Sequence, residues 1–413
     1  MPDLADCPVC GSQTTREFLR RAGVPVHQNL VMRDASSARS IARGTLAMRV
    51  CRDCGFVFNS AFDASPLSYG EQYDNTQTCS PAFDRYVGEM VRHLIDERGV
   101  RGKRIVEVGC GKGNFLRRLV ASEQADNRGW GFDPTYVGPE IELNGRLRFT
   151  RSFYDETCAS ATADVVVCRH VIEHVPDPCS MLRTVRAAIE ASDTPSARVF
   201  FETPCVNWIF RNRVVWDLFY EHCSLFTMES LSYAFARSGF HVIDARHVFG
   251  GQYLWLEATA VKAENAASFS TQSDEQLKNS TAVAAQASTY GRSVQRLVNR
   301  WRAMVEQLAA EGGICIWGAG AKGVTFASLV DPDGALIDCV VDLNQSKQGG
   351  FLPGTGHRIV SPERLANRTV ATAIVLNPNY AAEIRCMLES VAPNVRLVNL
   401  SKSTESLLRT TSV

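Results

Sequence analysis

The chain has 413 residues, with 44 basic and 44 acidic side chains that leave no formal net charge. This length predicts two to four domains of about 100–200 residues each. The balanced charge argues against nucleic acid or an anionic membrane as the partner and favours a small-molecule substrate. No stretch approaches the roughly 18 apolar residues of a membrane-spanning helix, and the first residues lack the regions of a signal peptide, so we expect a cytoplasmic protein.

The first 62 residues contain two cysteine pairs, each followed by glycine. Cys7 and Cys10 form one CxxC pair, and Cys51 and Cys54 form the other after forty residues. Two such knuckles can bring four thiolates into a tetrahedron, which suits a structural zinc ion because no coordination position stays open. A redox CxxC is disfavoured, because neither pair follows a strand and opens a helix. The sequence predicts a zinc-binding domain over residues 1–62, with part of its polar stretch 34–43 in a protruding loop.

The block 63–262 alternates strand-like and helix-like segments. Apolar runs at 104–108, 129–132, 164–168 and 198–201 indicate strands, with helix-like stretches between them. This order predicts an α/β domain with a mainly parallel sheet.

A glycine loop follows the first of these strands. Gly109, Gly111 and Gly113 allow a sharp turn and a close approach to a ligand, and Glu107 lies just before them. Asp133 ends the next strand, where a carboxylate can accept hydrogen bonds from two ribose hydroxyls. This set resembles the class I methyltransferase superfamily, whose E-x-G-x-G-x-G pattern differs from the dinucleotide fingerprint. The resemblance implies S-adenosylmethionine as cofactor, with the glycines under its methionine part and Asp133 at its ribose.

A Glu-His pair lies in the loop after the expected strand at 199–203. Loops that follow the carboxyl ends of strands in an open α/β sheet face the ligand crevice. His222 is therefore a candidate general base, and Glu221 a neighbour that orients it or raises its pKa. An ordinary structural histidine is the competing interpretation. We expect His170 and His174 only to line the loop after the strand at 164–168.

The block 263–413 begins with a polar connector at 262–281 and a helix at 283–310, and a second α/β unit follows. Its expected strands are 314–317, 337–342, 371–376 and one near 395–398. Backbone N–H groups at Gly318 and Gly320 could hold a pyrophosphate at a helix N-terminus. Asp342 ends the next strand, as in a dinucleotide site, so NAD remains an alternative ligand there.

The whole chain resembles one family, the bacterial nucleotide-sugar C-methyltransferases of branched-deoxysugar biosynthesis. The double CxxC, the class I core, the EHxxxF segment that ends at Phe226, and the C-terminal GxGAKG, DxNxxKQG…PG and NPxY motifs carry the resemblance in order. It implies a dTDP-linked 4-keto sugar that loses its C3 proton to a base and accepts a methyl group as an enolate. His222 matches the family's base and Glu221 its companion. The implied substrate-binding residues are Tyr73, Tyr220, Gly318, Gly320, Lys322, Lys347 and Asn377.

The chain departs from that family at two positions. Phe219, with Tyr220 beside it, stands where a tyrosine precedes the glutamate by two residues, and Leu225 replaces an aromatic residue. These departures affect the substrate, not the cofactor. Methylation of another small metabolite on O, N or C is the alternative function, and a scaffold with a degenerate core is a further one. The fold expected is a class I Rossmann-like core between a zinc-binding domain and a second Rossmann-like α/β domain.

Overall fold

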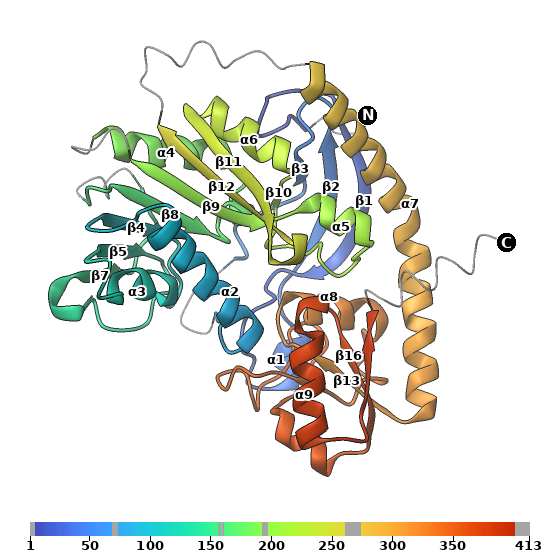
Figure 1. Ribbon diagram of the computed structural model, residues 1–413. Helices are drawn as coiled ribbons and strands as arrows, with labels where there is room; N and C mark the ends of the chain where they lie inside the picture. Colours follow the sequence, from blue (N-terminus) through green and yellow to red (C-terminus); the bar gives the residue numbers. More distant parts are fainter. Residues whose placement is uncertain are drawn as a thin grey trace.

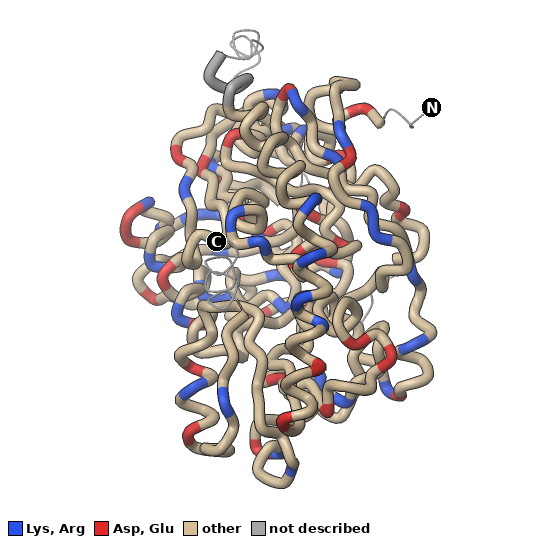
Figure 2. The backbone as a smooth tube through the Cα atoms, turned by 90° about the vertical axis from the view of Figure 1, so that its right-hand side faces the viewer, with Lys and Arg blue, Asp and Glu red and all other residues tan. Residues whose placement is uncertain are grey.

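The computed structural model describes residues 5–67, 73–155, 158, 161–191, 197–260 and 274–400. These residues form three β-sheets, which have four, eight and five strands. Figure 1 shows the N-terminal sheet beside the central block, and the C-terminal block below both. In Figure 2, basic and acidic residues are interspersed on the face turned to the viewer, as the balanced composition predicts. None of the described helices is long and apolar enough to cross a membrane.

The N-terminal sheet has the order β1-β2-β3-β10. Strands β1 (Thr15–Pro25), β2 (Arg43–Cys51) and β3 (Val57–Asn59) are antiparallel neighbours. The fourth strand, β10 (Ser224–Leu225), comes from the central block and pairs with β3. The loop that carries His222 is therefore fixed at its C-terminal end to the N-terminal sheet.

The central sheet has the order β11-β12-β9-β8-β4-β5-β7-β6. Its neighbours from β9 to β7 are parallel, and β12 runs antiparallel to both β9 and β11. The parallel strands β4, β8 and β9 are largely buried because helices cover both faces, which is why they are nearly continuous apolar runs. The strands are β4 (Arg104–Val108), β5 (Arg128–Phe132), β6 (Ile141–Glu142), β7 (Leu147–Thr150), β8 (Val165–Arg169), β9 (Arg198–Pro204), β11 (Phe240–Val248) and β12 (Tyr253–Ala260).

The helices of the central block connect these strands. Helix α2 begins after Ser80, whose hydroxyl accepts from the Phe83 N–H, and Pro81 occupies its first position. The helices are α2 (Pro81–Arg92), the π-helix η1 (His93–Glu97), α3 (Asn114–Ala121), η2 (Leu143–Gly145), η4 (Ile172–His174), α4 (Pro178–Glu190), α5 (Val206–Asn212), α6 (Met228–Arg237) and η5 (Phe249–Gly251).

The C-terminal sheet is parallel throughout, with the order β15-β14-β13-β16-β17. It confirms the prediction of a second Rossmann-like unit, and the expected strands agree with the observed ones within a few residues. The elements are β13 (Gly313–Trp317), α8 (Ala321–Val330), β14 (Cys339–Val341), β15 (Ile359–Val360), η7 (Pro362–Asn367), β16 (Val370–Val375), η8 (Pro378–Tyr380), α9 (Ala381–Val391) and β17 (Arg396–Asn399).

Helix α7 (Asp274–Glu311) joins the blocks. It packs against β1, β2 and α5 along one part and against α8 and β13 along another, and it runs down the side of the molecule in Figure 1. Its buried side chains include Tyr290 and Trp301. The predicted helix is confirmed and begins earlier than expected. Of the predicted connector, residues 262–273 lie outside the described residues.

The polar stretch at 34–43 does not protrude, so that expectation was wrong. Residues Ala35–Arg39 form the short helix α1, which docks on the C-terminal block. The Gly354 N–H donates to the Ala38 carbonyl over 2.8 Å, and the Arg43 guanidinium donates to the Gly354 carbonyl over 2.9 Å. Polar side chains are needed here because they satisfy backbone groups of another domain.

Candidate active site

The first glycine loop lies at the carboxyl end of β4 and borders a cavity of about 310 Å³. Gly109, Gly111 and Gly113 have φ values of 69°, 53° and 76°, a region that strains any residue with a Cβ. A Cβ on Gly113 would also lie 2.5 Å from the Phe149 ring. Gly109 and Gly111 line the cavity, while Gly113 precedes α3 and lies behind the wall.

Two acidic side chains line the same cavity. Asp133 accepts from the Gly111 N–H over 2.7 Å with one oxygen, and from the Thr135 N–H over 2.7 Å with the other. Glu107 is buried and accepts from the Leu116 N–H over 3.2 Å. Burial raises the pKa of Glu107 to about 8, against the opposing effect of Arg169. Both carboxyl groups are thus fixed at the wall of this cavity.

A second cavity, of about 250 Å³, lies between the central and C-terminal blocks. Most of the predicted substrate-binding residues line it, and so does His222. The two cavities share part of their walls, so a methyl donor in one and an acceptor in the other would meet there. The predicted residues on the second cavity are Tyr73, His222, Gly318, Gly320, Lys322, Lys347 and Asn377. The residues on both cavities are Tyr73, Asn75, Thr76, Gln77, His170 and His174.

His222 is a half-buried, neutral imidazole at the second cavity. Its ring centroid lies 4.0 Å from that of Phe219 and 4.8 Å from that of His174. Its Nδ1 is buried without a hydrogen-bond partner. Burial, followed by the charges of His174, His170 and Lys322, lowers the pKa of His222 well below its usual value. A histidine in this state can accept a proton at neutral pH.

His170 has more than the loop-lining role expected from the sequence. Its Nδ1 lies 3.3 Å from Glu173 and its Nε2 lies 3.2 Å from Glu202. Burial opposes protonation, but the two carboxylates outweigh it and raise the pKa of His170 to about 9. Arg169 and Tyr86 also contact Glu202, at 2.6 and 2.8 Å. Because both ring nitrogens face acids, His170 is a fixed cation and cannot serve as the base.

Glu221 and Tyr220 point away from the cavities. The Glu221 carboxylate is fully buried, accepts from the Gln28 N–H over 2.8 Å and lies 3.6 Å from His27 Nδ1. The Tyr220 hydroxyl bonds the backbone N–H and carbonyl of Asp63 at 2.9 and 3.0 Å. Neither residue lines either cavity, whereas Phe219 does.

The polar side chains of the C-terminal block at this cavity have partners from the other two blocks. Lys322 forms an ion pair with Asp217. Asn377 and Gln252 form a reciprocal amide pair, with N–O distances of 2.6 and 3.0 Å. The Lys347 ammonium lies 3.3 Å from Asn29 Oδ1. Asn29, Asp217, Gln252 and the segment 75–77 were missed by the sequence analysis, because no local pattern marks them.

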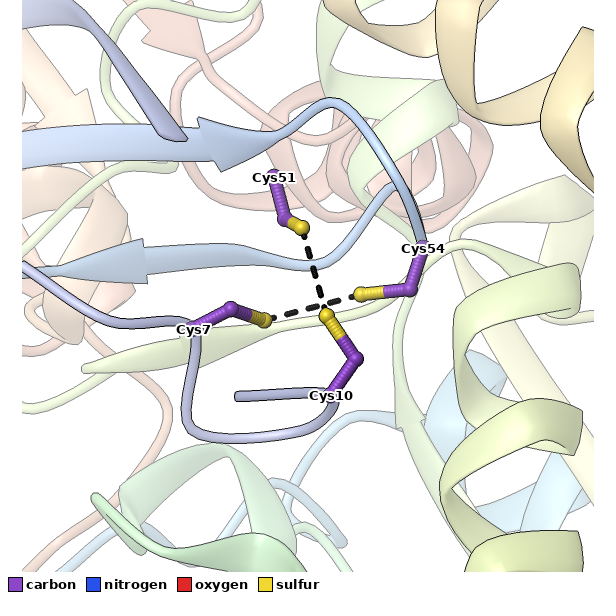
Figure 3. A group of neighbouring side chains, drawn as sticks. All are labelled: Cys7, Cys10, Cys51 and Cys54. Atoms are coloured by element: carbon purple, nitrogen blue, oxygen red, sulfur yellow. Dashed lines mark hydrogen bonds between the residues drawn. The ribbon is translucent and has the colours of Figure 1, made fainter. Parts of the chain in front are cut away.

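The four predicted cysteines converge in the N-terminal domain. Figure 3 shows their side chains pointing toward one another from two loops. The sulfur distances are 3.5 Å for Cys7–Cys54 and 3.5 Å for Cys10–Cys51, and all four atoms lie within 4.8 Å of one another. The two loops make the same kind of turn. In one the Gly11 N–H donates to the Cys7 carbonyl, and in the other the Gly55 N–H donates to the Cys51 carbonyl. A tetrahedral Zn²⁺ with bonds of about 2.3 Å would set the sulfur atoms about 3.8 Å apart, so the thiols fit it.

Comparison with known proteins agrees with this arrangement. Residues 83–245 match the family described as a methyltransferase domain, and residues 250–395 match the C-methyltransferase C-terminal domain. C-methyltransferase NovU of Streptomyces niveus is 24% identical over 390 residues, which cover 92% of this chain and 91% of that protein. Ubiquinone biosynthesis O-methyltransferase of Vibrio campbellii is 37% identical over 111 residues, 25% of this chain and 45% of its own. The solved structure of 1,6-didemethyltoxoflavin-N1-methyltransferase of Burkholderia thailandensis is 17% identical to this chain. The superposed region covers 46% of this chain and 82% of that protein, with a TM-score of 0.35.

The class I fold, the glycine loop with its two acids, and the matched methyltransferase domain define the class of protein. The chain is an S-adenosylmethionine-dependent methyltransferase. More narrowly, its residues 250–395 match the C-methyltransferase C-terminal domain, and its similarity to C-methyltransferase NovU extends over nearly the whole chain.

Proposed function

We propose that this enzyme methylates the carbon α to the ketone, C3, of a nucleotide-linked 4-keto sugar through an enolate. One observation carries the proposal: a single cavity joins the neutral His222 to the lysine-bearing glycine loop of the C-terminal block, and it shares a wall with the cofactor cavity. A nucleotide sugar has its reactive ring at one end and its phosphates at the other, which matches these two ends.

The residues of the chain would act as follows. S-adenosylmethionine, held by the loop of Gly109 and Gly111 and by Asp133, would supply a methyl group on an electrophilic sulfonium. His222 takes the C3 proton, whose acidity the neighbouring ketone increases, and this leaves an enolate carbon that can accept the methyl group. The protonated His170 adds positive charge beside the developing enolate. The protein mainly aligns the two carbons and excludes water.

Other residues support this reaction indirectly. Tyr73 is buried on the wall shared by both cavities, where it can contact the sugar. Glu221 would act through the N-terminal segment at Gln28 rather than through His222 itself. The Tyr220 hydroxyl anchors residue 63 and is not available to substrate.

We further propose that Cys7, Cys10, Cys51 and Cys54 hold one structural Zn²⁺. The geometry of the thiols and their burial support this, and four protein ligands leave no position for substrate. The ion would fix β2 and β3, and through β3 the strand β10 that follows His222.

The test is a screen of nucleotide-linked 4-keto sugars with methyl-labelled cofactor, with methyl incorporation read by mass. The expected result is a mass gain on the sugar ring, with the C3 proton replaced by methyl. Methylation only of unrelated small metabolites would favour the alternative O-, N- or C-methyltransferase. A protein that binds cofactor and methylates nothing would favour the scaffold.

A further inference from the structure

One segment of the chain forms most of the wall that the two cavities share. Residues 73–80 directly precede α2, and four of the six residues that line both cavities belong to them. Thr78 lines only the cofactor cavity, while Cys79 and Ser80 line only the second cavity. A ligand in either cavity therefore lies against the same segment, residues 73–80, which we call the strap.

The strap is held by hydrogen bonds rather than by a hydrophobic core. Tyr73 is buried, but every later residue of the strap is half-buried or exposed, and none lies in a helix or strand. The Asp74 N–H donates to the Asn29 carbonyl over 3.0 Å. The Asn114 amide, at the start of α3, donates to the Thr78 hydroxyl over 3.3 Å. Segments with little buried apolar surface open at a low cost in free energy, so the strap can open while the sheets stay folded.

The C-terminal block supplies further anchors for the strap. The Ser346 hydroxyl donates to the Asp74 carboxylate over 2.6 Å. The Tyr380 hydroxyl donates to Gln77 Oε1 over 3.3 Å, and Tyr380 itself lines the second cavity. The position of the strap over the cofactor cavity therefore depends on a block that contributes no residue to that cavity.

Glu383, in the first turn of α9, fixes the end of the strap with both carboxylate oxygens. One oxygen accepts from the Ser80 hydroxyl and the other from the Ala82 N–H, each over 2.7 Å. Ser80 is the N-cap of α2 and Ala82 lies in its first turn, so α9 satisfies the N-terminus of a helix in another block, and Figure 1 shows the two helices side by side. Negative charge is favourable there, and charge-assisted hydrogen bonds are strong. Helix α2 in turn carries Phe83 to the wall of the cofactor cavity.

We propose that the strap closes over cofactor and acceptor together, and that Glu383 is the positioning residue that ties it to the C-terminal block. Either ligand stabilises the closed strap, and the closed strap favours the other ligand, so the two affinities are coupled in both directions. Closure also keeps water away from the reacting carbons. The inference rests on the proposed function only for the identity of the acceptor, because the contact of the strap with the cofactor cavity requires no particular substrate.

Calorimetry on the full chain, with S-adenosylhomocysteine and dTDP as probes, tests the coupling. In the wild type, dTDP should raise the affinity for S-adenosylhomocysteine about 5-fold or more. Glu383→Ala should lower the affinity for S-adenosylhomocysteine alone by about 3-fold or more and should remove the enhancement by dTDP, although Glu383 does not line the cofactor cavity. Glu383→Gln keeps an acceptor for the Ala82 N–H and should retain most of both effects. Glu389→Ala, at an exposed position of the same helix, should change neither.

Hydrogen exchange followed by mass spectrometry observes the strap directly. In the wild type, S-adenosylhomocysteine and dTDP should each slow exchange at residues 74–83, and both together should slow it most. In Glu383→Ala, S-adenosylhomocysteine should slow exchange there much less. The buried strand β4 serves as the internal reference, because its exchange should be the same in both proteins if the fold is intact.

The outcomes separate the strap from the proposed function. If Glu383→Ala binds S-adenosylhomocysteine as the wild type does, with the same enhancement by dTDP, the strap is wrong and the substrate class stands. If the wild type binds S-adenosylhomocysteine but not dTDP, the nucleotide-linked substrate falls, and the affinity of Glu383→Ala for S-adenosylhomocysteine still decides the strap. If exchange in β4 shows that Glu383→Ala is misfolded, the wild type decides: ligands that leave exchange at residues 74–83 unchanged would overturn the proposal.

Discussion

The two glycine-loop units of this enzyme share a backbone plan and differ in the side chains around the loop. In each, an acid that ends the next strand accepts an N–H of the loop: Asp133 that of Gly111 over 2.7 Å, and Asp342 that of Ala319 over 2.6 Å. The wall of the first cavity adds the buried Glu107, whose pKa of about 8 leaves its carboxyl mostly protonated at neutral pH, and the wall of the second adds the buried Lys347. A buried ammonium suits an anionic ligand group. The side chains around a loop, rather than the loop itself, therefore distinguish the ligands.

The two units also differ in their dependence on the N-terminal domain. The second cavity receives Asn29 from that domain, and the loop of His222 continues into β10, which pairs with β3. The cofactor cavity receives no residue from the segment 5–67. The following expectations test this division.

Loss of the proposed zinc ion should have the largest effect on turnover. Protein purified without added metal should contain about one zinc per chain, and Cys54→Ser should remove it, because hydroxyls are poor zinc ligands. Since structural zinc contributes on the order of 10 kcal/mol to the folding of its domain, turnover should fall to background. S-adenosylhomocysteine binding should fall much less.

Metal analysis, turnover and calorimetry check this, with Cys386→Ser on the exposed face of α9 as the control. A zinc-free Cys54→Ser protein with normal turnover would refute the structural site. A loss of S-adenosylhomocysteine affinity as large as the loss of turnover would refute the division between the cavities.

His222→Ala should lower turnover by about 10²-fold or more, because it removes the base while leaving the cofactor cavity intact. Wild-type enzyme in deuterated water should exchange the C3 proton of substrate, as followed by NMR, and the variant should not. His241→Ala, on an exposed position of β11, is the matched control. Near-normal turnover of His222→Ala would transfer the base role to His174 or Tyr73, which line the same cavity.

Asp133→Ala should lower cofactor affinity at least about 10-fold, since each charge-assisted hydrogen bond contributes roughly 1.5–3 kcal/mol. Asp342→Ala makes the same change in the second unit and should leave this affinity unchanged. Calorimetry with S-adenosylhomocysteine measures both. Equal losses would show that the two loops do not serve separate ligands.

Glu221→Gln should lower kcat/KM by less than about 10-fold, because the amide oxygen can still accept from the Gln28 N–H. The loss should appear mainly as a raised KM for the keto sugar, since Glu221 holds the segment that carries Asn29. Steady-state kinetics beside the exposed control Glu389→Gln measure it. A loss confined to kcat would indicate that Glu221 acts on His222 directly.

The sequence predicted those parts of the molecule that local patterns encode. The strand-loop-helix units, the converging cysteines and the position of His222 on a cavity follow from short motifs, because each needs only neighbouring residues. Asn29 lies 318 residues from Lys347, and the pairing of Lys322 with Asp217 likewise depends on how the blocks meet. The direction of Glu221 was also hidden, because its partner Gln28 lies 193 positions away. Contacts of this kind have no period or motif.

The smallest effect is expected in the pH profile of kcat. An unperturbed histidine base would lose activity as the pH falls through about 6.5. Burial, followed by the charges of His174, His170 and Lys322, lowers the pKa of His222 well below that value, so its neutral, proton-accepting form should persist as the pH falls. With saturating substrate and cofactor, kcat should therefore change less than about twofold between pH 7.5 and roughly 6. Glu202→Gln should alter this profile, because it removes a carboxylate that helps hold the pKa of His170 at about 9, and a less charged His170 would lower the pKa of His222 less. The descent in kcat should then move to higher pH. A wild-type profile that falls around pH 6.5 would show that His222 is an unperturbed histidine and that its burial and the charge of His170 do not control its protonation.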